Sequence, residues 1–367
     1  MVAGADIVVT SYALFRIDEN AYQDLSWAGL LLDEAQFVKN HQAKTYQCAR
    51  KLPAPFKLAI TGTPMENNLM ELWSLLSIVA PGMYPSPTRF AEFFAKPIER
   101  GNATERLALL RRRIRPLMLR RTKEQVATEL PPKQEAVLPI ELSSRHQRIY
   151  QTRLQRERQK ILKLIDDLDA NRFTILTSLT TLRQLSLDPA LVDEAHGGVG
   201  SAKIDALLEM LEDVVGEGHR ALVFSQFTGF LRRVRDRLDS SGIPYAYLDG
   251  RTRKRQEAVD AFKSGDAPVF VISLKAGGVG LNLTEADYVF VLDPWWNPAV
   301  EAQAVDRAHR IGQTKNVMVY RLVSQDTIET KVMELKARKE ELFASVMEED
   351  GGFGSALSAD DIRGLFD

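Results

Sequence analysis

Apolar residues in the first 80 positions fall into short runs that amphipathic stretches separate. The runs Ile7–Thr10, Gly29–Leu32 and Lys57–Ile60 have the length and composition of buried strands. Buried strands that alternate with helical patterns favour a parallel α/β sheet, whose strand ends carry the functional loops. Three strands are too few for a complete doubly wound sheet, and we therefore expect the chain to begin inside a domain.

A second and clearer alternation begins at Ser201, which has the position of a helix N-cap. Ile204, Leu207 and Leu211 then recur at helical spacing. Further along, the pattern predicts strands at 221–225, 245–248, 269–273, 287–292 and 317–322, with helices between the first two pairs and at 299–309. These elements predict a second parallel sheet with right-handed crossovers.

The region between the two alternations is helical and charged. It is basic from Pro81 to about Leu130, and after Pro131-Pro132 a strand at 136–142 precedes a charged helical stretch from Arg145 to about Leu187. We therefore predict a first domain at 1–134 with a helical protrusion at about 81–130, and the start of a second domain with a helical insertion at 135–200. The main part of the second domain follows at 201–345, and an acidic tail with a short helix at 346–367.

Composition and charge narrow the class of protein. No apolar run is long enough to span a membrane, and the single cysteine, Cys48, excludes an internal disulfide and suits a reducing cytoplasm. The net charge is −1, but residues 100–123 hold nine bases and one acid, and residues 145–163 hold seven and one. Residues 340–367 hold eight acids and one base. Two basic runs favour contact with phosphates over a merely solvated helix face.

Two short motifs follow the predicted strands of the first domain. Asp33 and Glu34 come directly after a buried strand, where an aspartate can hold a magnesium ion and a glutamate can orient or deprotonate water. An ordinary acidic strand end is the alternative. Thr61-Gly62-Thr63-Pro64 places two hydroxyl groups on a tight turn after the next strand, and alone it is a common turn.

The second domain carries two segments suited to phosphates. In Ser273–Thr284, three glycines let the backbone approach a ligand, and Lys275 and Asn282 offer a phosphate and a ribose contact. Arg307 and Arg310 lie three apart on a predicted helix, so both guanidinium groups can reach one phosphate. Surface arginines at this spacing are common. The evidence that these segments bind a nucleotide comes mainly from the order of the motifs along the chain.

In that order, the motifs resemble the Swi/Snf family of DNA-dependent ATPases, which belong to the helicase-like motors. The resemblance runs from about Asp6 to Leu335, and the family-specific segments are Thr61–Pro64 with Asn67–Leu76, Arg115–Lys123 with Leu130–Lys133, Val223–Phe227, Leu248–Gly250 and Asp293–Pro298. The resemblance implies an α/β fold of two RecA-like parallel-sheet lobes with helical protrusions, the first lobe being incomplete here. It also implies an ATP-dependent double-stranded DNA translocase that uses ATP and Mg²⁺.

The resemblance also assigns roles to individual residues. Asp33 becomes the magnesium residue, Glu34 the water-activating residue, and Arg307 and Arg310 the γ-phosphate fingers. Gln303, Gly280 and Asn282 would line the nucleotide cleft. The residues expected to contact DNA or to couple DNA to hydrolysis are Thr10, Ser11, Tyr12, Gln36, Thr61, Thr63, Lys275, Arg111, Arg112 and Arg113.

The sequence departs from the family pattern in two ways. Gln36 stands where many members have histidine, a change that bears on coupling more than on the magnesium site. No G-x-x-x-x-G-K-[ST] phosphate loop occurs, and we expect such a loop, which would precede residue 1, to be required for ATP hydrolysis. A non-catalytic, truncated nucleic-acid-binding fragment and a strand-separating helicase are the alternatives. We expect a monomer in the cytoplasm, associated with the nucleoid if the source is a bacterium.

Overall fold

The structure is a computed structural model that describes residues 4–62, 64–65, 68–100, 103–164, 167–276, 280–295, 297–334 and 337. The chain divides into two compact units, and the described part of the first ends at Arg120 while that of the second runs from Arg121 to Ala337. Thr63 and the predicted acidic tail with its short helix lie outside the described residues.

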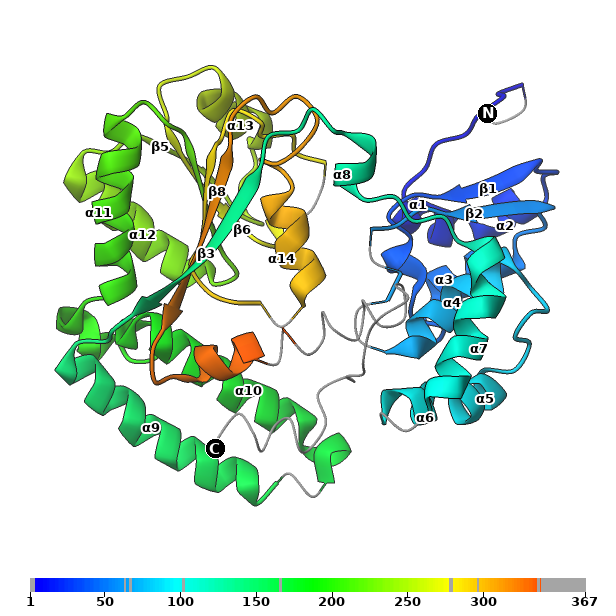
Figure 1. The fold of residues 1–367 in the computed structure, drawn as a ribbon, viewed down its shortest axis with the longest axis horizontal. Coiled ribbons are helices and arrows are strands. Elements are labelled where there is room, and N and C mark those ends of the chain that lie inside the picture. The colour runs from blue at the N-terminus through cyan, green and yellow to red at the C-terminus, as the bar shows by residue number, and fades with distance from the viewer. Residues whose placement is uncertain are drawn as a thin grey trace. The chain divides into compact units, whose positions relative to one another are not determined.

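The first unit holds a parallel pair of strands, β1 (Gly29–Leu32) and β2 (Phe56–Ala59), in register from Gly29 with Phe56 to Leu32 with Ala59. Both strands were predicted. The helical segments around them are α1 (Tyr12–Ile17), α2 (Glu19–Gln23), η1 (Ala35–Val38), α3 (Lys44–Lys51), α4 (Leu69–Val79), α5 (Pro87–Phe90), η2 (Ala91–Ala95), α6 (Lys96–Glu99), α7 (Thr104–Ile114) and η3 (Arg115–Leu117) (Figure 1).

Helix α4 forms the centre of the first unit's core. The Asn68 side chain caps the helix by accepting a hydrogen bond from the backbone N of Glu71 at 3.2 Å. Trp73, on the same helix, is 1 % exposed, and its indole N donates to Tyr84 O at 2.9 Å. A buried indole whose N–H is satisfied fixes both the helix and the loop that follows it.

The predicted buried strand at Ile7–Thr10 is wrong. These residues form no strand, and the side chains of Ile7 and Val9 are 81 % and 91 % exposed. An apolar run becomes a buried strand only when a neighbouring strand pairs with it and another layer covers it. Among the described residues of this unit, β1 and β2 pair only with each other.

The second unit contains a six-stranded parallel sheet in the order β3-β8-β7-β4-β6-β5. Its strands are β3 (Lys133–Ile140), β4 (Ala221–Ser225), β5 (Tyr245–Leu248), β6 (Val269–Ser273), β7 (Tyr288–Val291) and β8 (Val317–Ser324). The helical segments are α8 (Lys123–Val126), α9 (Ser144–Leu162), α10 (Leu168–Leu187), η5 (Pro189–Leu191), η6 (Glu194–Val199), α11 (Ala202–Gly216), α12 (Thr228–Ser241), α13 (Arg255–Lys263) and α14 (Pro298–Val305). Residues 328–334 are also helical.

Helices cover both faces of this sheet. Helices α11 and α12 pack on one face, against inward side chains such as Val223 and Val271 (Figure 1). Helices α13 and α14 pack on the other face, against the alternating neighbours Phe224 and Ile272. Because both faces are buried, strands β4 and β6 are apolar along almost their whole length. The expected α/β class with parallel sheets is confirmed.

A helical arm extends from the sheet. Helices α9 and α10 pack against each other and against residues 328–334 through a shared apolar cluster that includes Tyr150, Leu179 and Ile328. The Tyr150 hydroxyl accepts a hydrogen bond from the backbone N of Ile328 at 2.7 Å. The long helical stretch predicted from Arg145 to Leu187 is therefore two helices.

Candidate nucleotide and nucleic-acid sites

The acidic box of the first unit lies at the carboxyl end of β1. Asp33 is exposed, and its Oδ1 accepts a hydrogen bond from the backbone N of Glu34 at 2.9 Å. Glu34 has φ 49° and ψ 49°, a left-handed conformation that is uncommon for a residue other than glycine. Such strain persists where the surroundings fix the backbone, and it occurs frequently at functional sites.

A chain of hydrogen bonds joins the acidic box to the next strand end. Gln36 Nε2 donates to Glu34 Oε2 at 2.6 Å, and Thr61 Oγ1 donates to Gln36 Oε1 at 2.9 Å. The parallel register of β1 and β2 brings these residues together, since Ala35 N also donates to Ile60 O at 2.9 Å. Gln36 therefore orients the Glu34 carboxylate and connects it to the Thr61 loop.

The donor set of the acidic box fits magnesium. Among the described residues, no group of three or more His, Cys, Asp or Glu side chains could hold a metal ion. Mg²⁺ in phosphate-transfer sites is usually bound by one or two carboxylates together with water and substrate phosphates. The exposed Asp33 carboxylate, with Glu34 beside it, provides the oxygen ligands that such a site needs.

The Thr10-Ser11-Tyr12 segment lies next to the acidic box. The Tyr12 hydroxyl donates to Asp33 O at 2.6 Å, and burial together with the charges of Asp33 and Glu34 raises the pKa of Tyr12 to about 12. The Ser11 hydroxyl caps α1 by accepting from Leu14 N at 3.3 Å, and Thr10 is exposed. Tyr12 thus supports the backbone of Asp33, the predicted magnesium residue, a contact that the sequence did not indicate.

In the second unit, the two candidate arginines lie beyond the end of α14. The helix predicted over 299–309 ends at Val305, so the expectation that Arg307 and Arg310 share a helix face is wrong. Arg307 O accepts a hydrogen bond from Leu283 N at 3.0 Å instead of continuing the helix. We call residues 306–310 the arginine turn. Arg307 is 4 % exposed, whereas Arg310 is exposed, so Arg310 is the arginine within reach of an external ligand.

Two acids near the arginine turn form ion pairs with cations from other elements. Glu301 is fully buried and binds Arg321 at 2.5 Å, and Asp306 binds Lys123 at 2.7 Å. Lys123 also donates to His309 O at 2.8 Å. The arginine turn is therefore tied to residues that precede β3.

The other predicted nucleotide residues lie near this turn. The Leu283–Arg307 hydrogen bond places the exposed Asn282 beside the turn. Gly280 has φ 63°, a conformation that glycine adopts without strain. Gln303, on α14, is half-buried. The second unit thus gathers Gly280, Asn282 and the arginine turn at one place.

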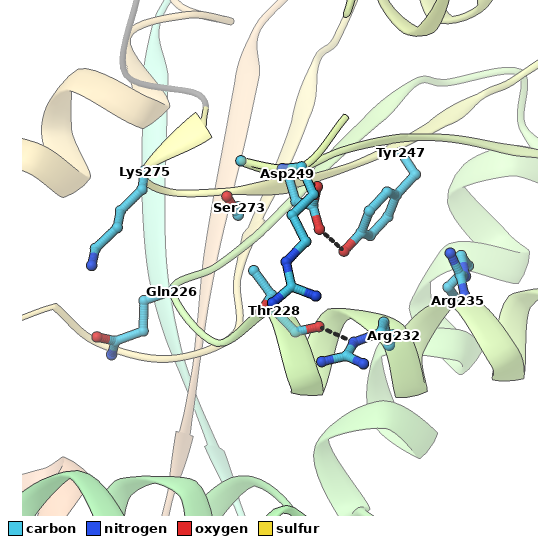
Figure 2. A pocket seen from close by; sticks show the side chains of 10 residues that line it. Gln226, Thr228, Arg232, Arg235, Tyr247, Asp249, Ser273 and Lys275 are labelled. Atoms are coloured by element: carbon cyan, nitrogen blue, oxygen red, sulfur yellow. Dashed lines mark hydrogen bonds between the residues drawn. The ribbon is translucent and has the colours of Figure 1, made fainter. Parts of the chain in front are cut away.

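A pocket of about 310 Å³ opens at the carboxyl ends of β4, β5 and β6. Four cationic side chains and one acid are among its lining residues, which are Gln226, Thr228, Arg232, Arg235, Tyr247, Asp249, Gly250, Arg251, Ser273 and Lys275. Figure 2 shows Arg232 and Arg235 on α12, and Lys275 after β6. Of the predicted DNA residues, this pocket includes Lys275.

Hydrogen bonds fix the acid of this pocket as a carboxylate. Burial opposes ionisation of Asp249, but donors from Arg251 N, Tyr247 and Thr252 outweigh it and lower the pKa of this carboxyl. Burial and the Asp249 charge raise the pKa of Tyr247 to about 12, so Tyr247 stays a hydrogen-bond donor. The Arg235 guanidinium lies 5.4 Å from the Tyr247 ring centre. The pocket is therefore a preorganised site with an excess of positive charge.

The basic runs form exposed helix surfaces. Arg112 and Arg113 are exposed at the end of α7, and Arg111 beside them is half-buried. On α9, exposed bases recur at helical spacing at Arg145, Arg148, Arg156, Lys160 and Lys163. Sequence reasoning missed Arg232, Arg235 and Arg251 as site residues. Their only signal was that they follow the family segments Val223–Phe227 and Leu248–Gly250.

No described helix is both long and apolar enough to span a lipid bilayer.

Comparisons with known proteins show which families the two parts of the chain match. The family model for the SNF2-related domain matches residues 1–191, and the model for the helicase conserved C-terminal domain matches residues 202–312. The C-terminal part of the Fun30 ATPase domain, a solved structure, is 27 % identical with a TM-score of 0.48, and covers 56 % of this chain and 90 % of that one.

Several curated relatives match nearly the whole chain. An uncharacterized ATP-dependent helicase of Mycoplasma pneumoniae is 36 % identical over 99 % of this chain and 35 % of its own length. The putative ATP-dependent helicase/translocase YwqA of Bacillus subtilis is 35 % identical over 99 % of this chain and 40 % of its own. A mouse SWI/SNF-related regulator of chromatin, subfamily A member 1, is 36 % identical over 90 % of this chain and 32 % of its own length.

The chain thus spans between about a third and two-fifths of the length of these relatives. The SNF2-related model alone covers more than half of the 367 residues. With a parallel sheet covered on both faces and an acidic box at a strand end, this protein belongs to the SNF2-related family of helicase-like ATPases.

Proposed function

We propose that this chain is the motor part of an ATP-driven translocase on double-stranded DNA. The observation that carries the proposal is the cationic pocket at the ends of β4, β5 and β6. Arg232, Arg235 and Lys275 are among the residues that line it. A cluster of this kind binds phosphates regardless of sequence. The excess of exposed bases on α7 and α9 supports the same proposal.

The nucleotide part of the proposal rests on the acidic box and the arginine turn. Asp33 would hold Mg²⁺, which would neutralise phosphate charge when bound. The Glu34 carboxylate, oriented by Gln36, would accept the proton of the attacking water. Arg310 would stabilise negative charge that develops on the phosphate, as an arginine finger does.

The printed sequence contains no phosphate loop of the G-x-x-x-x-G-K-[ST] type. Backbone N–H groups of such a loop and its lysine hold the β- and γ-phosphates, and a single exposed arginine does not replace them. We therefore propose that these 367 residues alone hydrolyse ATP negligibly. A DNA-stimulated turnover of about 1–100 s⁻¹ would contradict this part of the proposal.

Binding of a fluorescent duplex oligonucleotide tests the DNA part directly. Arg235→Ala should weaken binding and lower the slope of log K against log [NaCl] by about 1, because one phosphate contact is lost. Arg237→Ala is the matched control, since Arg237 lies on the same helix but pairs with Asp205 at 2.8 Å, outside the pocket. Equal effects of the two variants would refute the pocket as the DNA site. A preference for single strands would favour a strand-separating helicase.

A further inference from the structure

A hydrogen-bonded pair of residues joins the cationic pocket to the segment between β7 and α14. Gln226 lines the pocket, and both its backbone N and its Nε2 donate to the Asp293 carboxylate, at 3.2 Å and 2.6 Å. Asp293 follows β7 and is 0 % exposed. Gln226, which Figure 2 shows at the pocket, is thus hydrogen-bonded to a buried carboxylate outside it.

Arg183 holds the other side of this buried charge. This arginine comes from α10 and is 3 % exposed as a residue. Its Nη2 donates to Pro294 O at 2.5 Å and lies 3.6 Å from Asp293 Oδ2. Its guanidinium carbon also lies 5.4 Å from the ring centre of Phe227 and 5.9 Å from that of Trp295.

From Trp295 the contacts continue to the arginine turn. Trp295 N donates to Glu301 Oε2 at 3.2 Å, and Glu301 is a fully buried residue of α14. The last residue of α14, Val305, directly precedes the turn. Next to Asp293 along the chain, Lys203 Nζ donates to Leu292 O at 2.6 Å and so anchors the end of β7. A continuous series of buried and half-buried contacts therefore runs from the pocket to α14.

We propose that Arg183 and Asp293 form a buried relay that moves Trp295 and α14 when a DNA phosphate occupies the pocket. The proposal rests on the DNA-binding function above and goes beyond it by naming two positioning residues. A phosphate oxygen in the pocket offers Gln226 Nε2 a competing anionic acceptor. Once that donor leaves, Asp293 attracts the Arg183 guanidinium, which then releases Pro294 O.

The charges themselves favour a relay over a purely structural role. A buried ion pair contributes no more to stability than well-packed apolar residues of similar volume. Its electrostatic energy, however, depends strongly on which partner is nearest in a dry interior. Arg183 lies within 3.6 Å of both a carbonyl oxygen and a carboxylate oxygen, so a change in the balance between these two acceptors would move its guanidinium group.

The indole N–H resonances of the chain's four tryptophans test the relay. In ¹⁵N-tryptophan-labelled chain, a duplex oligonucleotide should shift the Trp295 signal with the same Kd as anisotropy gives, with Trp295→Phe identifying the signal. Trp73, in the core of the first unit, is the internal control, and its signal should not shift. In the double variant Arg183→Met/Asp293→Asn, which removes both buried charges, the shift of the Trp295 signal at saturating DNA should fall by at least about half.

A second variant keeps the test valid if the double variant does not fold. Gln226→Met removes the side-chain donor at the pocket surface, and at saturating DNA its Trp295 shift should be lost whatever its Kd. An undiminished Trp295 shift in either folded variant would mean that DNA acts on Trp295 without the relay, and would overturn it. DNA binding with no Trp295 shift in the wild type would overturn the relay alone. No binding at all would overturn both the relay and the proposed function.

Discussion

At the scale of single residues, the position of the acidic box at a strand end could be predicted from the sequence, but its backbone conformation could not. A carboxylate pair after a buried run predicted the end of β1. The left-handed conformation of Glu34 and its bond to Gln36 depend on the register of β1 with β2, which a linear pattern does not contain. The same register explains why Thr61 reaches Gln36.

The strain at Glu34 has a measurable consequence. Glu34→Gly should be more stable towards unfolding in urea than Glu34→Ala by about 1 kcal/mol, because only glycine adopts φ 49° without a steric penalty. Both variants lose the hydrogen bond to Gln36 equally, so their difference isolates the backbone. Tryptophan fluorescence reports the transition. Equal stability of the two variants would show that the backbone relaxes when the side chain is removed.

His146 makes stability depend on pH. It is 1 % exposed, and its Nε2 donates to Leu185 O at 2.6 Å. Burial lowers the pKa of His146 below the 6.5 of a free side chain, although Leu185 O, Asp188 and Glu329 oppose this effect. Below pH 6.5 the unfolded chain therefore binds a proton that the folded chain does not, and the folded state loses stability as the pH falls.

We expect the free energy of unfolding to decrease from pH 7.5 to pH 5.5 by up to about 1.4 kcal/mol per pH unit from this residue. His146→Gln, which keeps a donor for Leu185 O but does not titrate, should show a flatter profile. Denaturation in urea at several pH values measures both. Parallel profiles of the two proteins would assign the dependence to other groups.

At the scale of elements, buried strands were predicted best. The bounds of β4, β5 and β6 agree with the predicted ranges. For β4 and β6 the reason is that strands covered on both faces are apolar throughout and end where polar loops begin. The end of α14 could not be predicted. Gln313 Nε2 donates to Ala308 O and Ala286 O, and Leu283 N donates to Arg307 O, so tertiary partners replace the helical ones.

Lys123 gives the arginine turn a testable support. Its Nζ bonds to both Asp306 and His309 O, and it is about a third exposed, so solvent weakens the pair. Lys123→Met should speed hydrogen exchange of amides 306–313 by about 2- to 5-fold. Lys123→Arg keeps the charge and should restore most of the protection. Unchanged exchange in Lys123→Met would show that the turn is held by Gln313 and Leu283 alone.

At the scale of the whole molecule, the net charge gave no indication of the exposed basic surfaces proposed to bind DNA. A net charge of −1 hides the exposed bases of α7 and α9, which only the charge pattern along the chain and the helix surfaces reveal. The doubly wound sheet of the second unit was predictable as a class. The position of β3 at the edge of that sheet, beside β8, depends on long-range pairing and was not.

The basic end of α7 should contribute to DNA affinity without sequence preference. Arg112→Gln with Arg113→Gln should weaken binding similarly for duplexes of different sequence and lower the salt slope by up to about 2. Arg50→Gln with Lys51→Gln, on the exposed end of α3, is the charge-matched control. The same loss in both double variants would indicate a response to net charge rather than to a contact on α7.

The eight-residue register of β3 with β8 also has a mechanical meaning. β3 directly follows residues 121–132, which connect the two units along the chain. A pull directed along β3 would load the ladder from Lys133–Val317 to Ile140–Ser324 in shear, so that all of its hydrogen bonds would share the force at once. Tension generated between the units would reach the second sheet through a strand that resists it collectively, rather than through bonds that open one after another.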